Sequence, residues 1–149
     1  MALVSVTRLR IRSWRYMLPF ALYTLRAARQ AQGSSGFLGG WLGTSGSWAF
    51  WTVTVWTDET AMKRYRDNGV HKAAMPRMLD WANEGAMARY EQSGTQPPSG
   101  PAALSALESR GRISKVRHPT PEHSAGKTAP DGKPPFVGRV MPPKSKAPV

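Results

Sequence analysis

The side chain best placed for acid–base chemistry is His71, at the start of a helical stretch. Its imidazole titrates near neutral pH, so it can accept or release a proton under physiological conditions. Helical spacing puts His71 on the same inward-facing stripe as Met75. Two interpretations stay open: a general base, or a histidine that only hydrogen-bonds at the helix break formed by Asn68 and Gly69.

Aromatic residues surround this histidine in the sequence and are suited to an apolar wall. We expect the tryptophans to build the core and at least one of them to line a ligand pocket as well, because a ring with an N–H group suits a flat apolar ligand. The pocket residues expected on this basis are Trp51, Trp56, Tyr65, Met75 and Trp81. The alternative is that the whole set is packed core.

No second residue has an unambiguous catalytic role. Glu84 and Glu91 are the carboxylates near the last predicted strand, and their spacing does not indicate a catalytic pair. Cysteine is absent, which excludes disulfides, thiolate metal sites and a cysteine nucleophile. The sequence also lacks the motifs of serine hydrolases, zinc proteases, P-loop proteins and dinucleotide-binding folds. No metal site is predicted.

Hydrophobic periodicity predicts the elements that position these residues. Residues 3–12 alternate with a period near two and predict a strand with arginines on a solvent-facing side: Arg8, Arg10 and Arg12. Residues 16–31 predict a helix whose core-facing stripe is Leu18, Ala21, Leu22, Leu25 and Ala28.

A β-hairpin is predicted over residues 36–57, followed by two helical pieces that end near residue 82. Gly39 and Gly40 indicate a bulge or a close approach in the first hairpin strand. Pro76 indicates a kink or a restart in the second helical piece. Residues 85–93 predict a further strand, and 102–109 a short helix.

The order strand, helix, strand, strand, helix, strand predicts an α+β fold, the ferredoxin-like βαββαβ antiparallel sheet. Strand 48–56 is apolar on both faces, so we expect both faces to be covered. Helices would cover one face. A second copy of the chain is the simplest cover for the other, which predicts a homodimer through the sheet face, a dimeric α/β barrel.

The chain is predicted to have one domain, residues 1–118, and a C-terminal tail, residues 119–149. The tail holds eight of the 13 prolines and several lysines. Such a composition buries little apolar surface, so we expect the tail to be disordered and basic.

The formal net charge is +12, and no acidic residue precedes Asp58. A basic surplus suits nucleic acid, anionic lipid or an anionic ligand. No motif of a folded nucleic-acid reader accompanies the charge, so we expect no specific nucleic-acid partner. No apolar run reaches the length of a membrane span. The N-terminal stretch is better explained as the first strand and helix than as a signal peptide, which predicts a cytoplasmic protein.

Three segments carry a resemblance to known proteins: GFLGGWL, AFWTVTVWTDETAMKRY and NGVHKAAMPRMLDWANEGA, with RISKVRHP after them. Together they resemble the DUF3291 family of bacterial proteins, related to spheroidene monooxygenase and the antibiotic-biosynthesis monooxygenases of the dimeric α/β-barrel superfamily. The resemblance covers about residues 3–119. It implies a monooxygenase-like oxidoreductase acting on a flat hydrophobic substrate, or a non-catalytic protein that binds a small ligand or haem.

The resemblance also implies a choice of cofactor, none or haem. His71 would be the axial ligand, and Arg64 or Arg66 would pair with the propionates. One departure matters. In the haem-degrading relatives the axial histidine falls at the position of Met75, and Tyr65 stands where they have a tryptophan. Haem-degrading chemistry therefore does not carry over to this chain.

Overall fold

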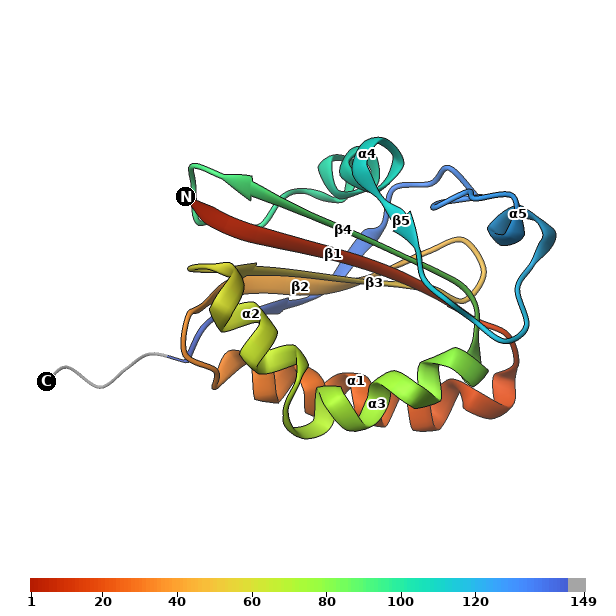
Figure 1. Ribbon diagram of the computed structural model, residues 1–149, viewed down its shortest axis with the longest axis horizontal. Coiled ribbons are helices and arrows are strands. Elements are labelled where there is room, and N and C mark those ends of the chain that lie inside the picture. The colour runs from red at the N-terminus through yellow and green to blue at the C-terminus, as the bar shows by residue number, and fades with distance from the viewer. Residues whose placement is uncertain (145–149) are drawn as a thin grey trace, which may run out of the picture.

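A six-stranded antiparallel sheet forms the centre of the molecule in the computed structural model, which describes residues 1–144 (Figure 1). The strand order is β5-β4-β1-β3-β2-β6. The four central strands carry the expected ferredoxin-like βαββαβ unit, which confirms the predicted α+β class. The strand bounds are β1 Ala2–Ile11, β2 Phe37–Ser45, β3 Ala49–Trp56, β4 Ala82–Gln92, β5 Arg112–Ile113 and β6 Phe136–Met141.

Helices cover both faces of this sheet. One face carries α1 (Met17–Gln32), α2 (Glu59–Arg66) and α3 (Gly69–Trp81), with the short 3-10 helix η1 (Trp14–Tyr16) before α1. The other face carries α4 (Gly100–Arg110), and α5 (Pro121–Ser124) lies beyond it. Helix α3 runs unbroken through Pro76. None of the helices in residues 1–144 is long and apolar enough to cross a membrane.

The predicted hairpin is β2 and β3, and its first strand has the predicted bulge. The register between the two strands shifts between Phe37 and Gly39, and Gly39 has a φ of 147°. The predicted close approach is at Gly40, where a Cβ atom would meet the Val53 carbonyl oxygen. A further close approach, which was not predicted, is at Gly43, where a Cβ atom would lie 2.6 Å from the Phe136 carbonyl oxygen. Small residues in β2 thus let β6 pair closely along its outer side.

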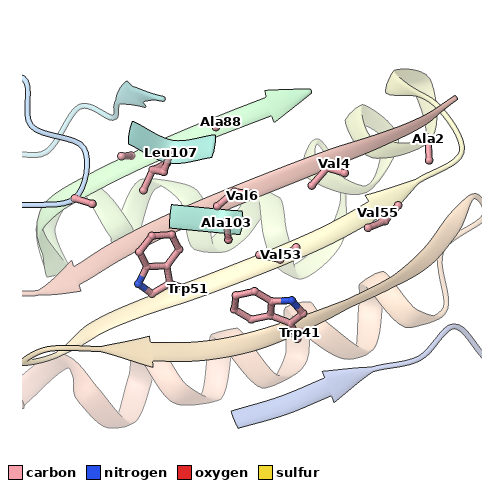
Figure 2. Close-up of a cluster of buried hydrophobic side chains, with 12 residues drawn as sticks. Ala2, Val4, Val6, Trp41, Trp51, Val53, Val55, Ala88, Ala103 and Leu107 are labelled. Carbon is pink, nitrogen blue, oxygen red and sulfur yellow. The ribbon is translucent and has the colours of Figure 1, made fainter. Parts of the chain in front are cut away.

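The sheet face that we expected a second copy to cover is covered by the chain's own α4. Figure 2 shows Ala103 and Leu107 of this helix packed over Trp51 and the central valines of β1 and β3. The Trp41 Nε1–H group donates to the Pro98 carbonyl oxygen at 2.8 Å and fixes the residues that lead into α4. The physical motive for a dimer through this face is therefore removed.

The prediction of a disordered tail needs correction for residues 119–144. These residues form α5 and β6, β6 pairs with β2, and Met141 is buried. The tail is ordered by pairing with a sheet edge and by polar contacts rather than by a large apolar core of its own. Residues 145–149 of the predicted tail lie outside the described residues.

Helix α1 is also rotated relative to the expectation. Leu18, Leu22 and Leu25 are exposed, although the sequence predicted them as the core-facing stripe. The buried residues of the helix are Phe20, Ala31 and Ala28, and of these Ala28 belongs to the predicted stripe. The small and aromatic side chains face the sheet, and the leucines face outward.

Arg8 of β1 requires a further correction, because its side chain is 1% exposed instead of solvent-facing. Its Nη1 lies 2.8 Å from Glu84 Oε1, and its Nη2 lies 3.4 Å from Asp131 Oδ2. The Thr120 hydroxyl donates to the other Glu84 oxygen at 3.0 Å, and Ser45 donates to Asp131 at 3.3 Å. This buried network joins β1 and β4 to the C-terminal segment.

We expect Arg8→Met to lower the free energy of unfolding by about 3–5 kcal/mol, because it leaves buried carboxylates without their cation. Urea denaturation followed by circular dichroism measures this change. The double variant Arg8→Met/Glu84→Gln should recover part of the loss. The matched control is Lys63→Met, which breaks the exposed Lys63–Glu59 pair and should cost at most about 1 kcal/mol. Equal losses for Arg8→Met and Lys63→Met would contradict a structural role for the buried network.

Candidate functional site

A cavity of about 670 Å³ lies between the sheet and the helices α1, α2 and α3. Its floor is the sheet face formed by alternate residues of β1 and β3, and many of these are short hydroxyl side chains: Ser5, Thr7, Thr52 and Thr54. Alanines and a tyrosine of α1 and methionines of α3 line the opposite wall. Such small side chains leave space between the layers, and most of the lining is apolar, as in ligand-binding pockets.

His71 lines this cavity from the first turn of α3. Its Nδ1 atom lies 3.1 Å from the Arg66 carbonyl oxygen. A carbonyl only accepts, so Nδ1 carries the proton and Nε2 keeps its lone pair. The backbone N–H of His71 donates to the Gln30 side chain of α1 at 3.0 Å, which fixes the residue further.

Burial lowers the pKa of His71 below its ordinary value, and the positive charges of Arg66 and Arg89 add to this effect. The hydrogen bond to the Arg66 carbonyl opposes it. The imidazole is therefore neutral at neutral pH, with the lone pair that a base or a ligand for iron requires.

Arg89 of β4 lines the same cavity and was not among the predicted site residues. Its Nε atom is buried without a hydrogen-bond partner. None of the ion pairs within residues 1–144 involves its guanidinium, and burial lowers its pKa. A guanidinium in such a place is a ready donor for an anionic group of a ligand. The signal in the sequence was the alternation of β4, since Ala86 and Ala88 face α4.

Tyr65 lines the cavity between two other rings. Its ring centroid lies 4.8 Å from that of His71 and 5.1 Å from that of Trp56. Its hydroxyl donates to the Ala27 carbonyl oxygen at 3.1 Å, and burial raises its pKa far above the ordinary value. Tyr65 therefore positions the imidazole and remains protonated.

The structure brings His71, Tyr65, Met75 and Arg66 to the cavity, and it places the other predicted residues elsewhere. Trp51 faces α4 on the opposite side of the sheet. Trp56 packs behind Tyr65, and Trp81 packs against Tyr16 and Tyr23 of η1 and α1.

The predicted charged partners are also reassigned. Arg64 is exposed and is not part of the lining, and Arg66 is held by both carboxylate oxygens of Asp67, at 2.7 and 3.0 Å. Glu84 belongs to the Arg8 network, and Glu91 is exposed. Within residues 1–144 no group of three or more metal-ligating side chains comes together.

The residues present fit a haem in part. The Nδ1–carbonyl hydrogen bond of His71 is the arrangement that orients an axial ligand. The predicted propionate partners do not assemble, because Arg64 lies outside the cavity and Arg66 is already paired. Arg89 is the arginine that remains for a propionate.

No protein-family model matches this chain, and no curated protein matches it. Solved structures do. A conserved protein from Methanosarcina mazei Go1 superposes with a TM-score of 0.57 at 11% identity, covering 62% of this chain and 94% of its own. A putative antibiotic biosynthesis monooxygenase from Nitrosomonas europaea gives 0.56 at 12% identity, covering 62% and 90%.

SnoaB from Streptomyces nogalater, described as a cofactor-independent oxygenase, gives a TM-score of 0.53 at 16% identity, covering 65% of this chain and 98% of its own. At these identities the likeness shows the fold alone, the ferredoxin-like fold of antibiotic biosynthesis monooxygenases. These neighbours are covered almost completely, whereas about a third of this chain lies outside the superposition.

We expect NMR titration of His71 to give a pKa below the ordinary value of about 6.5. Arg89→Gln should raise that pKa, because it removes a nearby positive charge. Arg64→Gln is the matched control and should leave it unchanged. His71→Ala assigns the resonance among the three histidines.

The same shift affects stability. Because the folded-state pKa of His71 is lowered, the free energy of unfolding falls as the pH drops from about 6.5 through the depressed value. His71→Gln should remove this part of the pH dependence. A His71 pKa that has its ordinary value in the wild type and does not change in Arg89→Gln would contradict the described site.

Proposed function

We propose that the cavity binds a flat hydrophobic molecule that carries an acidic or enolic oxygen, and that the protein is a monooxygenase-like enzyme. The observation that carries this proposal is the half-buried guanidinium of Arg89, whose buried Nε atom has no hydrogen-bond partner within residues 1–144, in an apolar cavity that also holds a neutral histidine. The apolar wall favours a hydrophobic body, and Arg89 favours an oxygen with negative charge.

In the proposed reaction His71 Nε2 takes a proton from the substrate, and Arg89 stabilises the resulting oxyanion. The electron-rich anion is then oxidised by dioxygen. An activated CH₂ group becomes C=O, and the second oxygen atom leaves as water, so no external reductant is needed. Tyr65 and the Arg66 carbonyl keep the imidazole in the tautomer that accepts this proton.

The comparisons support this proposal at the level of fold, and SnoaB is described as an oxygenase that works without a cofactor. The sequence resemblance to the DUF3291 family, and through it to spheroidene monooxygenase, points to the same substrate class. A dimer through the sheet face would first have to displace α4.

We expect the protein to bind 1-anilinonaphthalene-8-sulfonate, a flat apolar probe with one negative charge, in this cavity. Arg89→Gln should weaken binding about tenfold, the usual effect of losing one charge-assisted hydrogen bond. The uncharged analogue N-phenyl-1-naphthylamine should bind both proteins within about twofold. Fluorescence titration measures both affinities.

Arg64→Gln is again the matched control, because this arginine lies outside the cavity lining. An equal loss of affinity in both arginine variants would show a general effect of net charge and overturn the assignment of Arg89. Equal binding of the charged probe to wild type and Arg89→Gln would do the same.

Haem binding without turnover is a second candidate, favoured by the hydrogen bond that orients His71. In that case haem titration should give a shifted Soret band at about one equivalent per chain, with His71 as the iron ligand. The shift should be lost in His71→Ala. A wild-type spectrum identical to free haem would eliminate this candidate and leave the cofactor-free proposal in place.

A further inference from the structure

The outer face of α1 carries an unpartnered apolar stripe. Leu18, Leu22 and Leu25 are 70%, 46% and 39% exposed, and they follow one another at helical spacing. Trp14 of η1 precedes them by four residues and is 72% exposed. Exposed single leucines are ordinary on protein surfaces, but a continuous row of three leucines and a tryptophan marks an interaction site.

Basic residues frame this stripe. Arg26 and Arg29 continue it at the C-terminal end of α1, each four residues after a leucine, and Arg15 lies beside Trp14. All three are exposed, and none of the ion pairs described within residues 1–144 uses them. Helix α1 contains no acidic residue. The stripe therefore has an apolar centre and a positive border.

The neighbouring helix extends the same character. Helix α3 lies beside α1 in the layer that forms one side of the molecule (Figure 1). It exposes the basic side chains Lys72 and Arg77.

We propose that this surface, Trp14 to Arg29 of η1 and α1, binds the anionic surface of a lipid membrane as a peripheral contact. Leucines and tryptophan insert into the boundary between headgroups and acyl chains, and arginines pair with anionic headgroups. The long arginine side chains reach the headgroups while their stems cover apolar surface.

Charge argues against a second copy as the occupant of the stripe. A twofold contact through α1 would bring six arginines together without an acidic partner from either helix. An anionic lipid surface supplies the opposite charge over the whole stripe. This inference stands apart from the proposed oxygenase activity, although α1 also lines the cavity with Tyr23 and Ala27 on its other side.

The test is co-sedimentation of the full chain with vesicles of phosphatidylcholine alone or mixed with phosphatidylserine. We expect binding to the mixed vesicles, little binding to the neutral ones, and weaker binding at high salt. Leu22→Gln/Leu25→Gln and Arg26→Gln/Arg29→Gln should each reduce the partition coefficient about tenfold or more. Glutamine keeps helix propensity, so circular dichroism should show unchanged folding.

Matched controls remove the same kinds of group elsewhere. Phe136→Gln/Val140→Gln removes exposed apolar side chains of β6, and Arg112→Gln/Arg117→Gln removes two exposed charges. Both should leave vesicle binding within about twofold. Brominated lipids should quench the fluorescence of the wild type more than that of Trp14→Phe.

Three results would overturn the proposal: no binding to mixed vesicles, equal binding by the leucine variant, or equal losses in the matched controls. Sedimentation velocity adds a fourth. A dimer that dissociates in Leu22→Gln/Leu25→Gln, without vesicle binding by the wild type, would assign the stripe to a second copy instead.

Discussion

The Arg8 guanidinium is buried in the sheet face, and the segment that follows α4 contacts it through Asp131. A charge buried to this degree is tolerated only when anions and hydrogen bonds surround it. Glu84 comes from the neighbouring strand, but Asp131 lies far away in the sequence and must be brought over the sheet. Thr120 and His123 join the same region through Glu84 and the backbone of Gly85. The polar network thus determines where the segment after α4 runs.

Local patterns were sufficient for the central unit of the fold and insufficient for its covering. The hairpin, the bulge and the order of β1, α1, β2 and β3 follow from alternation, glycines and helix breaks, which are short-range signals. The ordered tail depends on long-range pairing of β6 with β2 and of Asp131 with Arg8. A proline-rich composition does not indicate which distant residues the segment will pair with. The sequence also did not show which face of α1 meets the sheet, because this helix has apolar side chains on both faces.

The site residues on helices could be predicted from their spacing. The site residues on strands could not, because the sequence does not show which face of the sheet they meet. His71, Tyr65 and Met75 reach the cavity as expected. Strand β3 has aromatic side chains on both faces, so its period could not tell which tryptophan would meet α4 and which the helices. Arg89 was missed because an arginine in a half-polar strand resembles a surface residue until its neighbours are known. The role proposed for Arg89 depends on its Nε atom, which is buried without a hydrogen-bond partner within residues 1–144.

Stability and binding are assigned to opposite faces of one sheet. The face under α4 is filled by tryptophans, valines, alanines and a leucine, together with the Arg8 network, so little space remains there for a ligand. The face under α1 and α3 carries short hydroxyl side chains and encloses the cavity, where packing contacts are missing and the folded state is weakened. The buried apolar cluster on the opposite face offsets this loss, and the buried Arg8 is paired there with Glu84 and Asp131. Strand β6 pairs with the outer side of β2 and forms the edge of the sheet, and its Met141 side chain reaches the cavity. Strand β6 therefore supports the cavity without contributing any of its polar chemistry.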